Sequence, residues 1–153
     1  MEDIIEVKNL KKYFPIRKGI LLREVGNVKA VDDVSFFVRK GETLGLVGES
    51  GCGKSTLGRT LIRLYEPTAG EIPFQNKNWL EVEGSELRNM RKDMQMIFQD
   101  PYSSLNPRIT IGQAIMEPMQ VHGILENDKA RKERVIELLH RVNMNESHFY
   151  RYP

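Results

Sequence analysis

Short apolar runs separated by turn residues fill the first part of the chain, a pattern typical of β-strands. Residues 4–10, IIEVKNL, alternate apolar and polar side chains, which predicts a half-buried strand. Proline and glycine interrupt the segment that follows, so a loop or loose hairpin is expected around residues 20–25. A second strand is predicted at residues 34–38, before a turn at Lys40 and Gly41.

An unbroken apolar run and a helical pattern follow one another in the centre of the chain. Residues 43–48, TLGLVG, predict a strand buried on both faces, as in a parallel sheet. Residues 54–65 carry apolar side chains at helical spacing, and Pro67 ends this pattern. Residues 68–74 predict a turn and a short strand, which Pro73 places at the edge of a sheet.

The predicted secondary structure changes near residue 100, from mixed strands and helices to mainly helices. A short helix is predicted at residues 84–91 and a buried strand, MQMIFQ, at residues 94–99. Two prolines stiffen the predicted loop that follows, DPYSSLNPR. We therefore expect an α/β core over residues 1–99 and a mainly helical segment over residues 100–153.

Two helices are predicted in the C-terminal segment. Thr110 and Gln113 have the spacing of a capping box, which predicts a helix that begins at Ile111. Pro118 is expected to kink or end this helix, because proline lacks a backbone N–H and its ring clashes with the preceding turn. Apolar side chains at helical spacing predict another helix at about residues 128–142.

The composition is that of a soluble globular domain. The chain has 153 residues, of which 40% are hydrophobic and 29% charged. Its 23 basic and 21 acidic residues leave a net charge of +2, too small and too scattered to indicate nucleic-acid binding. No apolar stretch approaches the roughly 20 residues that span a bilayer, and no signal-peptide pattern opens the chain. The single cysteine excludes an internal disulfide, so we expect a protein of a reducing cytosol.

A glycine-rich loop lies between the predicted strand and the predicted helix. Residues 48–56, GESGCGKST, match the pattern G-x-x-x-x-G-K-[ST] at Gly48, Gly53, Lys54 and Ser55. A loop around a polyphosphate points successive N–H groups inward, which glycine permits, and the helix adds its own unpaired N–H groups. Lys54 would supply a charge at the β and γ phosphates, and the Ser55 hydroxyl is suited to ligate Mg²⁺. The pattern predicts a nucleotide-phosphate site.

Plainer interpretations exist for this loop. It could be a glycine-rich turn with a surface lysine, although its position between a strand and a helix favours the phosphate site. The thiol of Cys52 could be acidified by the helix N-terminus. The interpretation we favour is that Cys52 is a small packing residue that tolerates the loop geometry.

Two segments carry a family resemblance: ESGCGKSTLGR and, further along, FQDPYSSLNPR. Together they resemble the ATP-binding subunits of ABC transporters, and more narrowly the second ATPase subunit of bacterial oligopeptide and dipeptide importers. The resemblance covers essentially the whole chain. It implies a P-loop NTPase fold of the ABC type, with an N-terminal antiparallel β-subdomain, ATP and Mg²⁺ as ligands, and the start of a helical subdomain.

The resemblance also assigns roles to residues. The Walker A loop would bind ATP through residues Gly48, Glu49, Ser50, Gly51, Cys52, Gly53, Lys54, Ser55 and Thr56. Tyr13 would stack on adenine, with Phe14 as the competing candidate, and Ala30 would pack near the sugar or base. Gln99 corresponds to the Q-loop glutamine, whose amide oxygen would reach Mg²⁺ or the attacking water, so that Ser55 and Gln99 are the expected metal ligands.

Several motifs of the family are absent from the sequence. No apolar run ending in Asp-Glu follows residue 100, the signature SGGQ is missing, and so is the switch histidine; the three histidines are expected on the surface. In the family a Tyr-Pro pair precedes the signature, and the chain stops at Tyr152 and Pro153. The sequence is therefore expected to be an N-terminal part of an ABC ATPase that binds ATP weakly at best and does not hydrolyse it alone.

The resemblance implies an ATPase that drives uptake of oligopeptides or dipeptides. Its partners would be a second ATPase subunit and membrane permease subunits at the cytoplasmic face of the inner membrane, with no nucleic acid and no direct contact with the peptide. Three alternatives stay open: an ABC-superfamily ATPase without a transport role, a small-molecule kinase, and a degenerate module that only binds a partner. Oligopeptide, dipeptide and nickel importers share these motifs.

Overall fold

The computed structural model describes residues 3–74, 77–100 and 104–153, in two compact units. The first unit comprises Met1–Met96 and the second Ile97–Pro153. Within the described ranges, no helix is both long enough and apolar enough to cross a lipid bilayer.

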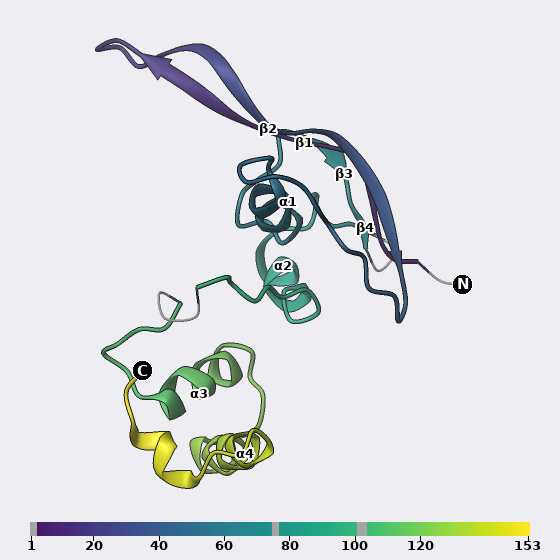
Figure 1. Ribbon diagram of the computed structural model, residues 1–153. Coiled ribbons are helices and arrows are strands. Elements are labelled where there is room, and N and C mark those ends of the chain that lie inside the picture. The colour runs from purple at the N-terminus through teal and green to yellow at the C-terminus, as the bar shows by residue number, and fades with distance from the viewer. Residues whose placement is uncertain (1–2, 75–76, 101–103) are drawn as a thin grey trace. The chain divides into compact units, whose positions relative to one another are not determined.

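A long antiparallel hairpin dominates the first unit (Figure 1). Strand β1 (Asp3–Lys18) pairs with β2 (Arg23–Arg39), and the short strand β3 (Ala69–Glu71) pairs with the other edge of β1. The sheet order is β2-β1-β3, so the strand expected at a sheet edge around residues 68–74 lies there. The hairpin expected around residues 20–25 is present, but its strands are longer than the sequence pattern predicted.

Two helices and a second strand pair complete this unit. Helix α1 (Lys54–Leu61) begins where it was predicted and ends one turn earlier, and α2 (Gly84–Met90) occupies its predicted position. Strand β4 (Pro73–Phe74) pairs with β5 (Lys77–Asn78). The core between these elements is formed by Val7, Leu10, Val31, Leu57, Ile72, Phe74, Trp79, Val82 and Met90.

A buried arginine ends α1. Arg63 adopts a left-handed backbone conformation with φ of 53°, which turns the chain out of the helix. Its guanidinium donates hydrogen bonds to the carbonyl oxygens of Trp79 and Val82, at 3.0 and 2.6 Å, and pairs with the Glu66 carboxylate at 3.2 Å. The indole of Trp79 in turn donates to the Leu61 carbonyl at 2.9 Å. These bonds connect the end of α1 to the segment that precedes α2.

Two predicted strands are wrong. Residues 43–48 have no regular secondary structure and pair with no strand of the described chain, and Val47 is 90% exposed. Residues 94–99 likewise form no strand, and Ile97 is 98% exposed. An apolar run shows that a segment is suited to burial between neighbours, but it does not identify the neighbours. The described three-stranded sheet includes neither segment.

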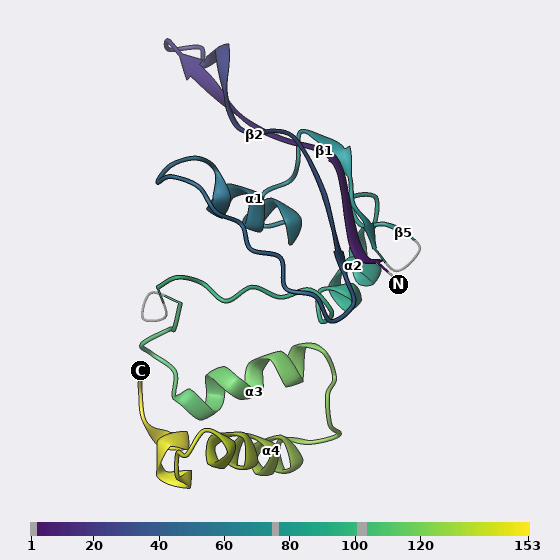
Figure 2. The ribbon, with the colours of Figure 1, turned by 45° about the vertical axis from the view of Figure 1, so that its right-hand side comes forward.

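The second unit is helical, as expected. Helices α3 (Ile111–Val121) and α4 (Asp128–Arg141) lie side by side, and the 3-10 helix η1 (Glu146–Tyr150) packs against both (Figure 2). The capping box of Thr110 and Gln113 is confirmed. A small core joins the three elements, formed by Met119, Val135, Leu139 and Phe149.

Pro118 does not end helix α3, so that part of the expected kink or end is wrong. Helix α3 runs through Pro118 to Val121, and the Pro118 carbonyl accepts a hydrogen bond from the His122 N–H at 3.1 Å. Because Pro118 lies in the last turn, its missing donor removes one bond without disturbing those that follow. Of the three histidines expected on the surface, His140 is exposed, whereas His122 and His148 are half-buried.

Candidate functional site

The glycine-rich loop forms a tight turn ahead of α1. The Cys52 N–H donates to the Glu49 carbonyl at 3.3 Å, with Ser50 and Gly51 at the exposed turn between them. Gly51 and Gly53 have φ of 82° and 101°, a conformation that L side chains rarely adopt. Glycine is therefore needed at these two positions for conformational reasons, as the sequence pattern indicated.

The side chain of Lys54 folds back over this loop. Its Nζ donates to the carbonyl oxygens of Gly48 and Glu49, each at 2.7 Å, and lies 3.4 Å from the Cys52 Sγ. The ammonium is thus held at the loop by backbone oxygens. The structure thus brings Lys54 into contact with three other residues of the loop pattern: Gly48, Glu49 and Cys52.

The first turn of α1 presents unpaired donors next to this ammonium. The first hydrogen bond of the helix runs from the Leu57 N–H to the Gly53 carbonyl at 2.8 Å. The N–H groups of Lys54, Ser55 and Thr56 therefore have no acceptor within the helix. No side chain caps this end, Ser55 is exposed, and the helix dipole places partial positive charge here. Loop and helix together form a site suited to an anion.

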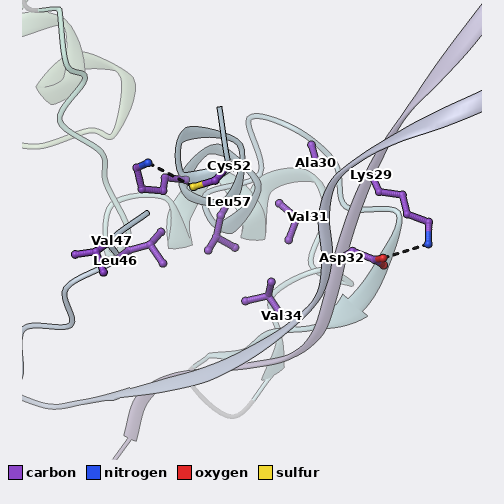
Figure 3. A pocket seen from close by; sticks show the side chains of 11 residues that line it. Lys29, Ala30, Val31, Asp32, Val34, Leu46, Val47, Cys52 and Leu57 are labelled. Carbon is purple, nitrogen blue, oxygen red and sulfur yellow. Dashed lines mark hydrogen bonds and ion pairs between the residues drawn. The ribbon is translucent and has the colours of Figure 1, made fainter. Parts of the chain in front are cut away.

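A pocket of about 360 Å³ adjoins the loop. Ala30 and Val31 of β2 line it on one side, and Leu46 and Val47 of the unpaired segment also line it (Figure 3). Ala30 also lies against the loop, since a Cβ placed on Gly53 would overlap the Ala30 carbonyl oxygen. The residue expected near a bound nucleotide thus lines a pocket beside the predicted phosphate loop.

Tyr13 is held by two charged neighbours from β2. Its hydroxyl donates a hydrogen bond to the Asp32 carboxylate, and the Lys29 Nζ donates to the same carboxylate at 3.1 Å. The Lys29 Nζ also lies 5.3 Å from the centre of the Tyr13 ring. The hydrogen bond to Asp32 raises the pKa of Tyr13, and the bonds from Tyr13 and Lys29 lower the pKa of Asp32.

Sequence reasoning missed Lys29 and Asp32. The pair register sets Tyr13 opposite Lys29, and this register could not be read from the chain because several bulges interrupt the hairpin. Phe14, the competing candidate for the base, packs edge-on against Tyr65 with ring centroids 5.5 Å apart. Tyr13 therefore has the polar neighbours, whereas Phe14 belongs to a packed aromatic pair.

Gln99 belongs to the second unit and is exposed. In the loop that follows it, residues 101–103 lie outside the described part of the chain, and the Ser104 hydroxyl donates to the Asp100 carbonyl at 2.7 Å. Within the described residues, no group of three or more His, Cys, Asp or Glu side chains is arranged to hold a metal ion. The predicted metal ligands, Ser55 and Gln99, are of other types.

The fold and the loop together define a class of protein: a domain with a glycine-rich loop, suited to an anion, between an antiparallel hairpin and a helix. The sequence profile described as ABC transporter matches residues 31–152. The chain belongs to the ABC transporter family.

Several characterised proteins are similar to the chain. It is 54% identical over 153 residues to the oligopeptide transport ATP-binding protein AppF of Bacillus subtilis (strain 168), covering 99% of the chain and 46% of that relative. It is 50% identical over 152 residues to the glutathione import ATP-binding protein GsiA of Pectobacterium atrosepticum, covering 24% of that relative. OppF of B. subtilis is 50% identical over 156 residues, 48% of its length. The chain thus spans less than half the length of these relatives.

A solved structure confirms the fold. The dimeric ATP-binding cassette MJ0796, described as bound to ADP and Pi, superposes with a TM-score of 0.77 at 24% identity. The match covers 97% of this chain and 61% of that one. The predicted fold class, an ABC-type α/β domain with an antiparallel N-terminal sheet, is thereby confirmed.

Proposed function

We propose that residues 48–56 bind the triphosphate of ATP, as part of an ABC-type ATPase that drives import of oligopeptides or dipeptides. The observation that carries this proposal is the position of the Lys54 ammonium, 2.7 Å from the Gly48 and Glu49 carbonyl oxygens and next to the unpaired N–H groups of α1. A cation and a helix N-terminus that meet at a glycine loop suit a polyphosphate. The names of the relatives AppF and OppF, oligopeptide transport ATP-binding proteins, support the same assignment.

Within this proposal the loop residues have distinct roles. Lys54 binds the β and γ phosphates, and Gly48, Gly51 and Gly53 allow the backbone to approach them closely. The remaining loop residues, Glu49, Ser50, Cys52 and Thr56, contribute backbone groups to the same site.

Magnesium ion fits the oxygen donors that the protein offers. The exposed Ser55 hydroxyl stands in the first turn of α1, where it would ligate Mg²⁺, and the Gln99 amide oxygen would be a second ligand. When bound, Mg²⁺ neutralises phosphate charge and orients the γ phosphate.

The base of the nucleotide would lie between the hairpin and the loop. The Tyr13 ring is oriented through its hydroxyl by Asp32, and a base stacks on an aromatic face with little discrimination between purines. Ala30 would pack against the sugar or base, because it lines the pocket beside Gly53.

The whole protein would hydrolyse ATP as one of two paired ATPase subunits, attached to membrane permease subunits at the cytoplasmic face of the inner membrane. It would contact neither the peptide nor nucleic acid. Hydrolysis also needs a group that positions the attacking water and a further Mg²⁺ ligand. The sequence contains no apolar run ending in Asp-Glu that would supply them, so we propose that these 153 residues bind ATP weakly at best and do not turn it over.

Titration calorimetry of Mg-ATP into the protein tests the proposal. Lys54→Ala is expected to weaken binding about 30-fold or more, because it removes a charged contact to the phosphates. Lys92→Ala is the matched control. Lys92 is exposed, follows α2 in the sequence and does not line the pocket. Equal affinities of wild type and Lys54→Ala would contradict the phosphate site. Steady hydrolysis that Lys54→Ala abolishes would contradict the proposed lack of turnover.

A further inference from the structure

The end of the β1–β2 hairpin carries three exposed aliphatic side chains in succession. The strands remain paired as far as Lys18 and Arg23, and the turn closes with a hydrogen bond from the Leu22 N–H to the Gly19 carbonyl at 3.1 Å. Ile20, Leu21 and Leu22 are 101%, 76% and 65% exposed. Figure 1 shows this end of the hairpin extending away from α1 and α2. We call residues 16–28 the hairpin tip.

The turn keeps these side chains exposed at a conformational cost. Leu22 has φ of 47°, in the left-handed region where glycine and asparagine are favoured over leucine. Isolated exposed apolar residues need no explanation, but three in succession at a strained, hydrogen-bonded turn do. Further exposed aliphatic residues, Ile16, Val25 and Val28, continue the apolar surface along the two strands.

Basic residues border the apolar turn. Arg17 and Lys18 precede it and Arg23 follows it, whereas Glu24 is the single acidic residue of the hairpin tip. Arg17 lies opposite Glu24 in the strand register. Among the ion pairs of the described residues, none involves these three cations.

We infer that the hairpin tip binds an anionic lipid bilayer, with Ile20, Leu21 and Leu22 inserted among the acyl chains and Arg17, Lys18 and Arg23 at the headgroups. Aliphatic side chains next to cations match the apolar interior and the negative surface of such a bilayer. A stable protein interface needs about 800 Å² on each partner and is depleted in lysine at its centre. A narrow, basic turn suits the bilayer better than it suits a protein surface.

Flotation with lipid vesicles tests this inference without nucleotide, so its outcome is independent of the proposed ATP site. The protein is mixed with vesicles of phosphatidylcholine alone or with about one third phosphatidylserine. Binding to the anionic vesicles is expected to exceed binding to the neutral ones about tenfold or more. Each cation contributes roughly fivefold, so Arg17→Gln, Lys18→Gln and Arg23→Gln combined are expected to remove most of the difference.

Matched variants separate the hairpin tip from general charge and hydrophobicity. Lys40→Gln, Lys92→Gln and Lys129→Gln combined remove three exposed cations elsewhere and are expected to lower binding far less. Ile20→Ser, Leu21→Ser and Leu22→Ser combined are expected to abolish binding. In contrast, Ile124→Ser, Leu125→Ser and Val142→Ser, also at exposed positions, are expected to leave it unchanged. If the substitutions at the hairpin tip and the controls have equal effects, the inference is wrong.

Fluorescence shows whether the turn enters the bilayer. The chain has one tryptophan, Trp79, which is fully buried, so Leu21→Trp adds an indole whose emission reports on the turn. Anionic vesicles are expected to shift this emission to shorter wavelength, and lipids brominated in the acyl chains are expected to quench it. An unchanged, unquenched emission would overturn the inference and would point to a protein partner for the hairpin tip.

Discussion

Gly53 and Ala30 are in such close contact that the first position has no room for a side chain. A Cβ at Gly53 would overlap the carbonyl oxygen of Ala30, and Gly53 has φ of 101°. Glycine is therefore required at this position of the glycine-rich loop for two reasons: its own backbone conformation and the strand beside it. This contact positions the loop against β2 and the pocket.

Gly53→Ala is accordingly expected to lower the free energy of unfolding by about 2 kcal/mol or more, from backbone strain and overlap together. Gly51→Ala is the matched control. Gly51 has φ of 82°, but nothing lies within 4 Å of its Cβ position. It is expected to cost only about 1 kcal/mol. Urea unfolding followed by circular dichroism measures both, and equal losses would show that the contact with Ala30 is unimportant.

Asp32→Asn is expected to lower the pKa of Tyr13 toward its ordinary value. The hydrogen bond to the Asp32 carboxylate favours the protonated phenol and is the main cause of the raised pKa of Tyr13. Absorbance titration at alkaline pH measures the shift, with Tyr13→Phe to assign the signal. Asp33→Asn, at the adjacent exposed carboxylate, is the control. An unchanged pKa of Tyr13 in the Asp32→Asn variant would argue against this contact.

The same hydrogen bond affects how stability depends on pH. The pKa of Asp32 is lowered in the folded protein, chiefly by the Tyr13 hydroxyl and then by Lys29. Its contribution is therefore present above about pH 4 and is lost as the pH falls through the folded-state value. Asp32→Asn is expected to reduce the loss of stability as the pH falls. Thermal melts from about pH 2 to about pH 7 would record this change.

Arg63→Ala is expected to lower the free energy of unfolding by about 2–4 kcal/mol. It leaves the carbonyl oxygens of Trp79 and Val82 without their donor in a buried place. Arg39→Ala serves as the control, because Arg39 is exposed and its ion pair with Asp3 is 3.9 Å long. That variant is expected to change stability by less than about 0.5 kcal/mol. Similar effects of the two substitutions would contradict the anchoring role of Arg63.

Gly112→Ala is expected to destabilise the helical unit, although alanine favours a helix by about 1 kcal/mol. A Cβ at Gly112 would overlap the ring of Phe149, which is part of the core between α3, α4 and η1. We expect a net loss of about 1–3 kcal/mol. Combining it with Phe149→Leu tests the cause, since the two costs are expected not to add when the smaller side chain leaves room. Additive costs would show that overlap with the Phe149 ring is not the cause of the destabilisation.

Local features were predictable because the residues that determine them are neighbours in the chain. The start of α1 at Lys54, the capping box at Thr110 and the left-handed glycines all depend on residues within about four positions of one another. The length of the hairpin was not predictable in this way. Charged residues and bulges along β1 and β2 obscure the alternation of apolar positions that would indicate a strand.

The sequence by itself thus determined the class of site, a glycine loop with a lysine at a helix start, and the helical nature of the second unit. Only the tertiary structure decided that Tyr13 meets Asp32 and Lys29, that Gly53 touches Ala30, and that residues 43–48 remain unpaired among the described strands. The physical reason is that register and burial depend on segments far apart in the chain, whereas caps, turns and glycine conformations depend on adjacent residues.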